Sequence, residues 1–408
     1  MNNAELLVRG LERMGVRWVF GVPSGPVLPL IEALRRSQTV DFVLTATETS
    51  AGFMAEAVGR LTGVPGVCVS TVGPGATNLA TGVGGAWLDR SPVIAITATY
   101  PTRSLDRRTQ MLIDHRALFA PLTTGSYRLA PGAVAAGLEQ AASLAISEPP
   151  GPVFLELPED VAVAEATEPD APLPRAAPQR DAPDDLPARV SALLENARNP
   201  LVVAGLTFTR SRHPERLARF CQRHAIPFVT TLHAKGFIPE SLPGALGVMG
   251  RARRTDVARA IAGADLILAV GFDPVEIDYE DWGGETPVAH LSTEPVQPGT
   301  GITLAYQGVG GMDALLEALE AIPTRENGWD PTQWTAHQEA LDAALRPDIT
   351  GFAAHQALDV LRERLPADAI LAYDVGAHTH QIATQWRTDV PHTAVATNGW
   401  SSMGYGMP

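Results

Sequence analysis

The sequence has little cysteine, no excess of basic charge and no long apolar run. Two of its 408 residues are cysteines, Cys68 and Cys221, and they lack the spacing of metal ligands, so we expect reduced core residues in a cytoplasmic protein. The net charge of −14 offers no basic stripe for phosphates, which argues against a nucleic-acid partner. No signal peptide is recognisable and no run of about 18 apolar residues occurs, so we expect no membrane span.

The apolar residues, 45% of the chain, form short strands that alternate with helical segments. Trp18–Val22, Val67–Val69 and Pro92–Thr97 predict buried strands, and this alternation is typical of doubly wound parallel α/β sheets. A proline-rich, acidic and aperiodic stretch interrupts the alternation and predicts a linker. We expect one domain over residues 1–164, the linker over 165–187, a central α/β domain over 188–320, a connector over 321–348 and the start of a third domain over 349–408.

The stretch from Asp41 to Asn78 carries the strongest chemical signal. It predicts a strand, a helix, a second strand and then a Gly-Pro-Gly turn that opens another helix. Glu48 stands where the first strand meets its helix. One interpretation places Glu48 in a capping box with Thr45. The other makes it a buried carboxylate that shares a proton with the ring nitrogen of a ligand beside the glycine turn, and the neighbouring apolar strand and turn favour this second interpretation.

Five motifs follow one another in an order that resembles a known family. They are GVPSG at 21–25, the Glu48 unit with GPGATN at 73–78, PPGPVFLELP at 149–158, KGFIPE at 235–240 and DVG at 374–376. Together they resemble the thiamine-diphosphate enzymes of the acetolactate synthase type. The resemblance implies a pyrimidine-binding domain, a Rossmann-like central domain and an incomplete diphosphate-binding domain.

The resemblance also implies roles for individual residues. Glu48 would hydrogen-bond the aminopyrimidine of thiamine diphosphate, and Gln110 would lie near the cofactor, with a solvated loop glutamine as the alternative. Met403 would support the bent cofactor while the Ser401 carbonyl reaches its amino group, with plain packing as the alternative for Met403. The other residues expected to bind the cofactor are Pro23, Gly25, Gly73, Gly75, Asn78, Asp374, Gly376 and His378.

Further partners and cofactors are implied in the same way. Mg²⁺ would hold the diphosphate through ligands expected beyond Pro408, so we expect a fragment or a chain completed by another chain. FAD occurs in the central domain of some family members, and Gly247–Arg251 resembles their glycine turn, with a structural turn as the alternative. No G-x-G-x-x-G fingerprint follows the first strand of that domain. Active sites shared between subunits imply a homodimer or homotetramer.

The implied reaction is the conversion of pyruvate, a small 2-keto acid, to acetolactate in branched-chain amino acid biosynthesis. One departure qualifies it, because Thr47 stands where many acetolactate synthases have histidine. A decarboxylase, lyase or acyltransferase that acts on another 2-keto acid or acyloin is therefore the alternative. A homologue that binds a ligand or partner without turnover is a third hypothesis, from a different functional class.

Overall fold

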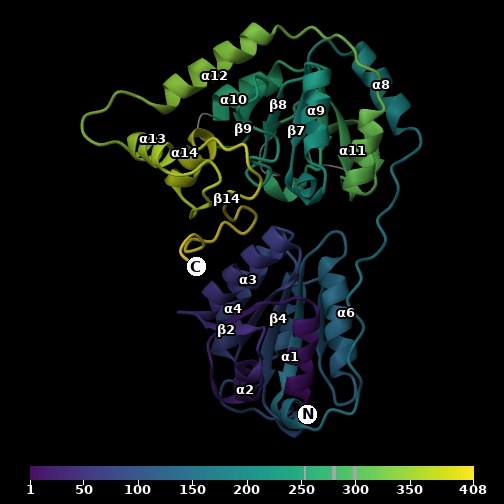
Figure 1. The fold of residues 1–408 in the computed structure, drawn as a ribbon, viewed down its shortest axis with the longest axis vertical. Coiled ribbons are helices and arrows are strands. Elements are labelled where there is room, and N and C mark those ends of the chain that lie inside the picture. Colours follow the sequence, from purple (N-terminus) through teal and green to yellow (C-terminus); the bar gives the residue numbers. More distant parts are fainter. Residues whose placement is uncertain (252–253, 278–281, 297–300) are drawn as a thin grey trace. The chain divides into compact units, whose positions relative to one another are not determined.

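The computed structural model describes residues 1–251, 254–277, 282–296 and 301–408 and divides into two compact units (Figure 1). The first unit comprises Met1–Pro178 together with Gly399–Gly406 and Pro408. The second comprises Gln179–Asn398 and Met407. Among the described residues no helix is both long and apolar enough to cross a membrane.

The first unit is built on a parallel sheet of six strands in the order β2-β1-β3-β4-β6-β5. Because each strand is parallel to its neighbours, all carboxyl ends lie at one edge of the sheet. The strands are β1 (Trp18–Gly21), β2 (Asp41–Leu44), β3 (Gly66–Ser70), β4 (Val93–Thr99), β5 (Gly125–Arg128) and β6 (Pro152–Pro158).

Helices cover both faces of this sheet (Figure 1). Strand residues alternate between the faces, so that Val67 and Val69 enter one apolar cluster while Cys68 enters the other. One face carries α1 (Asn3–Arg13), α2 (Leu28–Arg36), α6 (Val134–Ile146) and α7 (Glu159–Val163). The opposite face carries α3 (Glu48–Thr62), α4 (Pro74–Leu88) and α5 (His115–Phe119).

The second unit contains another parallel six-stranded sheet, in the order β12-β11-β10-β7-β8-β9. Its strands are β7 (Pro200–Ala204), β8 (Phe228–Thr230), β9 (Ala245–Val248), β10 (Leu266–Val270), β11 (Pro287–Ser292) and β12 (Thr303–Val309). Helices α8 (Leu186–Asn196), α9 (Glu215–Arg223) and α11 (Met312–Glu320) cover one face, and α10 (Arg254–Ala262) and α12 (Pro331–Leu345) the other. The predicted parallel α/β fold class is confirmed.

The second unit also contains a small two-stranded sheet with two helices. Strands β13 (Leu371–Ala372) and β14 (Ala394–Val395) pair in parallel, and α13 (Ala354–Arg364) and α14 (Ala377–Gln385) pack beside them. Buried Trp386 belongs to the apolar cluster that joins these elements.

The proline-rich stretch is extended but attached at its first half. The Glu168 carboxylate accepts hydrogen bonds from the N–H groups of Val134 and Ala135, at 2.5 and 3.0 Å, and so caps the start of α6. Arg13 donates to the carbonyl of Ala171. This part of the predicted linker is therefore fixed to the first unit, while the three-domain division itself stays a prediction.

Candidate functional site

The first sheet has a switch point between β1 and β3. From these neighbouring strands the chain proceeds in opposite directions, to β2 at one side and to β4 at the other. Open α/β sheets bind ligands in the crevice outside the carboxyl ends of such strands. The turn after β3 and the N-termini of α3 and α4 lie at this edge.

Glu48 is the first residue of α3, and Thr47 is its N-cap. The Thr47 hydroxyl accepts from the Ser50 N–H at 3.2 Å, whereas the Thr45 hydroxyl donates to the Thr47 carbonyl at 2.8 Å. The capping box between Thr45 and Glu48 is therefore wrong, because the cap lies two residues later. The Glu48 side chain is left free of that role.

The carboxylate of Glu48 reaches the N-terminus of α4. Glu48 is only 9% exposed, and the Asn78 amide donates a hydrogen bond to its Oε2 at 3.1 Å. A Cβ added to Gly75 would lie 3.2 Å from Glu48 Oε1 and 2.9 Å from Thr71. A side chain at position 75 would fill the space beside Oε1, so the glycine keeps one carboxylate oxygen accessible to a ligand.

Gly73 fixes the turn that leads into α4. Its φ of 57° and ψ of −108° lie outside the region that other residues adopt without strain. An added Cβ would also lie 2.4 Å from the Met111 carbonyl oxygen. The Gly73 N–H donates to His115 Nε2 at 3.1 Å, in a fully buried contact.

His115, the first residue of α5, is completely buried against the neighbouring strands β4 and β6. Its Nδ1 lies 2.9 Å from the Thr97 hydroxyl on β4 and 3.7 Å from the Glu156 carboxylate on β6, which also pairs with Arg128. Burial lowers the pKa of His115 to about 4, Asp114 opposes that lowering and Arg128 adds to it. The imidazole is therefore neutral near pH 7.

Three further predicted residues of the first unit lie in loops and are exposed. Pro23 and Gly25 belong to the loop after β1, at the carboxyl edge of the sheet. The Gln110 backbone carbonyl accepts from the Tyr100 hydroxyl at 3.1 Å, and its residue is exposed. The structure thus groups Glu48 with the turn into α4 and leaves these three at the surface.

Asp374, Gly376 and His378 lie together in the second unit, where the chain enters α14. Gly376 is the N-cap of that helix, and the Asp374 carboxylate accepts from the Val375 N–H at 2.7 Å. His378 is exposed, and its ring lies 3.1 Å from the position of a Cβ on Gly376.

Ser401 and Met403 belong to the C-terminal segment that is part of the first unit. Both are exposed, Met403 at 78%, and Ser401 has a φ of 50°. The segment is anchored around them by the Gly399 N–H, which donates to Asp89 at 2.7 Å, and by the Tyr405 hydroxyl, which donates to Glu56 at 2.5 Å.

Two family models match the chain. The N-terminal TPP binding domain of thiamine pyrophosphate (thiamine diphosphate) enzymes matches residues 1–118, and their central domain matches residues 188–319. The chain is 30% identical over 432 residues to the probable acetolactate synthase large subunit of Methanocaldococcus jannaschii. The alignment covers all of this chain and 72% of that protein. The chain belongs to the acetolactate synthase type of thiamine-diphosphate enzymes.

Other relatives of this enzyme point the same way. The acetolactate synthase large subunit of Corynebacterium glutamicum is 30% identical over 424 residues, all of this chain and 67% of that protein. That of Lactococcus lactis is 28% identical over 418 residues, all of this chain and 72% of that protein. The predicted family is confirmed, and with it a thiamine-diphosphate-dependent function like that of acetolactate synthase.

Sequence reasoning missed the buried polar groups of this thiamine-diphosphate enzyme. Glu156 is a carboxylate inside the otherwise apolar strand β6, and Glu56 is a fully buried carboxylate in the middle of α3. Glu56 accepts from the Ser91 hydroxyl at 2.6 Å and from Tyr405, and it pairs with Arg60 at 3.2 Å. A charge within an apolar segment was the available signal, because buried charges require partners.

The second unit of the enzyme has its own switch point, between β7 and β10. Glu276 follows β10 and is 3% exposed; its Oε2 accepts from the Leu206 N–H after β7 at 2.7 Å. Its Oε1 lies 3.2 Å from His233 Nδ1, after β8. A protein carboxylate therefore occupies the first turn of this sheet.

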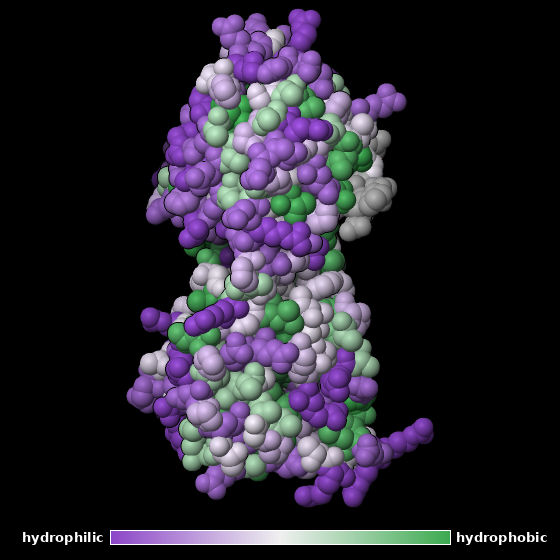
Figure 2. Space-filling model, turned by 90° about the vertical axis from the view of Figure 1, so that its right-hand side faces the viewer, coloured by the Kyte–Doolittle hydropathy of each residue, from purple (hydrophilic) through white to green (hydrophobic). Residues whose placement is uncertain are grey.

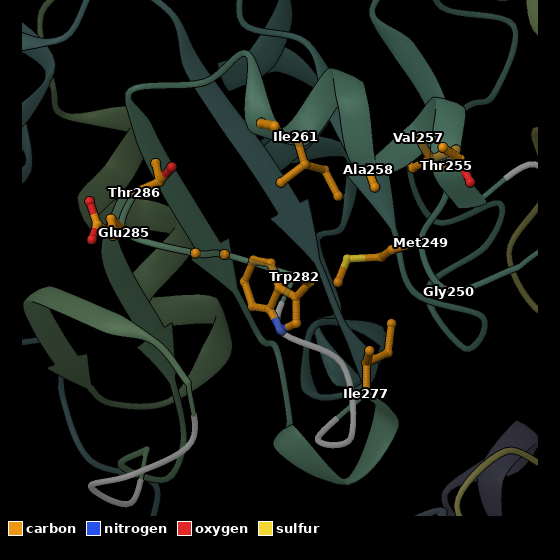
Figure 3. Close-up of a pocket in the computed structure, with 13 residues that line it drawn as sticks. Met249, Gly250, Thr255, Val257, Ala258, Ile261, Ile277, Trp282, Glu285 and Thr286 are labelled. Atoms are coloured by element: carbon orange, nitrogen blue, oxygen red, sulfur yellow. The ribbon is translucent and has the colours of Figure 1, made fainter.

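A cavity of about 510 Å³ is lined by α10, by Met249 and Gly250 after β9, and by residues 282–286 before β11 (Figure 3). Figure 3 shows Met249 and Trp282 side by side in it, with Ile261 and Ile277 on either side. Met249 and Gly250 belong to the predicted glycine turn, so that turn does line a cavity. Among the described residues no group of three His, Cys, Asp or Glu side chains could hold a metal ion.

Proposed function

We propose that this enzyme joins two molecules of pyruvate to form acetolactate and carbon dioxide, with Glu48 as the residue that binds the aminopyrimidine of thiamine diphosphate. One observation carries the proposal. Glu48 is a nearly buried carboxylate at the switch point, with one oxygen held by Asn78 and the other beside the space that Gly75 leaves open. Such a site fits a flat ring whose nitrogen accepts a proton from a carboxyl group.

Thiamine diphosphate supplies a carbon acid whose conjugate base attacks the carbonyl of a 2-keto acid. The chain's own part is to hold a proton at Glu48 toward the ring nitrogen. Asn78 fixes the carboxyl group in one orientation, because its amide donates to Oε2 alone. The low exposure of Glu48 limits competition by water for the other oxygen.

The remaining predicted residues are assigned to the rest of the cofactor. The N-terminus of α14, with Asp374, Gly376 and His378, offers backbone N–H groups of the kind that bind phosphate groups. Ser401 and Met403 are proposed to contact the aminopyrimidine side, and Gln110 the substrate side. Mg²⁺ at the diphosphate stays a prediction of the family resemblance.

A second candidate function is a decarboxylase, lyase or acyltransferase of the same cofactor class. This second candidate is supported by Thr47, which takes the place of a histidine common in acetolactate synthases. Since the Thr47 hydroxyl caps α3, it serves the helix and offers the substrate no imidazole. The choice of acceptor therefore rests on other residues.

The switch point of the central unit does not fit the diphosphate of FAD. The diphosphate of such a ligand binds at the first βα turn through backbone N–H groups. Here the Leu206 N–H of that turn already donates to the Glu276 carboxylate, and a ligand phosphate would meet a buried negative charge. We propose an enzyme without FAD. A homo-oligomer and a cytoplasmic location stay predictions.

The reaction is tested by incubating the protein with thiamine diphosphate, Mg²⁺ and pyruvate and identifying the products by NMR. We expect acetolactate and carbon dioxide in equal amounts, and a loss of about 10²- to 10⁴-fold in kcat for Glu48→Gln. Glu159→Gln is the matched control, because Glu159 is likewise the first residue of a helix, α7, after a strand of this sheet. Acetaldehyde alone would instead identify a decarboxylase, and binding without any product a ligand-binding homologue.

A further inference from the structure

The glycine turn beside Glu48 is hydrogen-bonded to a buried side chain that has no part in the proposed reaction. His115 Nε2 receives the Gly73 N–H at 3.1 Å, across 42 positions of sequence. The N–H of Gly73 and the imidazole are both buried, so water cannot replace this hydrogen bond if it is lost. The turn is therefore attached to His115 by a buried hydrogen bond.

The surroundings of the imidazole determine which nitrogen carries the proton. Because Nε2 accepts from Gly73, the neutral ring must carry its proton on Nδ1. Nδ1 faces the Thr97 hydroxyl at 2.9 Å and the Glu156 carboxylate at 3.7 Å, and both can accept that proton. Glu156 is in turn paired with Arg128. This arrangement fixes the tautomer that leaves Nε2 as an acceptor.

The turn sets the position of the residues that face Glu48. Two residues after Gly73, Gly75 leaves the space beside Oε1, and Asn78, the fifth residue of α4, donates to Oε2. Gly73 has a φ of 57°. Because glycine has no Cβ, its backbone can adopt many other conformations if the N–H loses its partner. A displacement there would move both contacts of the carboxylate at once.

We propose that His115 is a positioning residue for the Glu48 site: by accepting the Gly73 N–H, it holds the glycine turn in the conformation that receives the aminopyrimidine of thiamine diphosphate. This inference rests on the proposed function of Glu48. His115 itself touches neither cofactor nor substrate in this account. Its role is to keep the apo-enzyme in the binding conformation.

Two substitutions separate the two ring nitrogens. The amide oxygen of His115→Gln can stand where Nε2 stands and still accept the Gly73 N–H. The amide of His115→Asn is one bond shorter; it can stand where Nδ1 stands and bond Thr97, but it leaves Gly73 unpaired. Both variants carry a neutral polar side chain of similar size, so a general packing role predicts the same effect for both.

The experiment measures two quantities for each variant. Hydrogen exchange of the Gly73 amide, in protein without cofactor, reports the bond to residue 115 directly. Calorimetric titration with thiamine diphosphate and Mg²⁺ reports binding. For His115→Asn we expect faster exchange of the Gly73 amide and about tenfold weaker cofactor binding, and for His115→Gln near wild-type values of both.

Equal exchange and equal binding in the two variants would overturn the positioning role. The result also separates this inference from the proposed function. If Glu48→Gln binds the cofactor as wild type does, then the Glu48 site itself is wrong. If Glu48→Gln loses binding while His115→Asn retains it together with Gly73 protection, only the role of His115 is wrong.

Discussion

At the scale of the residue, the candidate site depends on which polar group pairs with which. Glu48 is available to a ligand because Thr47, not Thr45, caps α3. That choice of cap is not visible in the sequence, because either threonine can cap a helix and the capping-box pattern, with Glu48 three residues later, favours Thr45 instead. The long-range bond between Gly73 and His115 was likewise beyond local patterns, although the glycine turn itself was predicted.

The pH dependence of stability follows from the burial of His115. Its pKa is about 4 in the folded protein and ordinarily 6.5, so folding favours the neutral ring. The stability that this site contributes is complete above about pH 6.5 and is lost as the pH falls toward 4. In His115→Gln nothing titrates at this position, so its stability depends less on pH.

Urea unfolding of wild type and His115→Gln at two pH values measures this contribution. Between about pH 7 and about pH 5 we expect the wild type to lose about 2 kcal/mol more than the variant. The wild-type ring faces Asp114, Glu156 and Arg128, which both proteins share, so the difference isolates the imidazole. An identical loss in the two proteins would contradict the assignment of a neutral buried His115.

At the scale of the element, α3 and α4 must approach closely to bring Glu48 and Asn78 together. Their backbones meet at Gly52 and Gly82, where a Cβ on Gly82 would lie 2.6 Å from the Gly52 Cα. Glycine in a helix interior costs stability, so its use at this crossing serves the close approach. The crossing thus links the spacing of two helices to the geometry of the site.

Gly82→Ala tests that link, with Gly85→Ala on the same helix as its control. We expect Gly82→Ala to destabilise the fold by about 1–3 kcal/mol and to weaken thiamine-diphosphate binding, because α3 and α4 must separate. A Cβ on Gly85 would meet only Phe53, at 3.6 Å, so Gly85→Ala should be neutral or stabilising by up to about 1 kcal/mol. Thermal unfolding and calorimetry measure both effects, and equal stability of the two variants would disprove the close crossing.

Much of the element pattern followed from the sequence. The short apolar run Val67–Val69 predicted β3, and the side chains on its two faces enter different apolar clusters. Helix α12 was expected only as part of a connector, because tertiary packing of Trp334 and Leu341 decides it more than its own periodicity does. Strand β12 escaped prediction, since its first residues are exposed and its pattern is interrupted by glycine.

At the scale of the whole molecule, both compact units contain a parallel six-stranded sheet, but the strand orders differ and so do the turns at their switch points. In the first unit the turn after β3 leaves space beside a carboxylate, whereas in the second the turn after β7 is filled by one. On the face that Figure 2 shows, hydrophilic side chains are interspersed with smaller hydrophobic groups. The similar sheets therefore need not share a ligand.

We expect the purified protein to carry no flavin. Glu276 occupies the turn at which a dinucleotide phosphate would bind, so the protein should be colourless and should not bind added FAD. Visible absorbance of the purified protein, and flavin fluorescence of the supernatant after denaturation, measure this. Stoichiometric flavin in either measurement would show that the cavity beside Trp282 takes FAD despite Glu276.

The most direct test of the central claim is a calorimetric titration of the protein with thiamine diphosphate in the presence of Mg²⁺, repeated with Glu48→Gln and Glu159→Gln. A hydrogen bond to a charged or proton-sharing group contributes about 1.5–3 kcal/mol, so Glu48→Gln should bind roughly 10- to 100-fold more weakly. Glu159→Gln should bind as the wild type does. Wild-type affinity in Glu48→Gln would contradict the assignment of Glu48 to the cofactor.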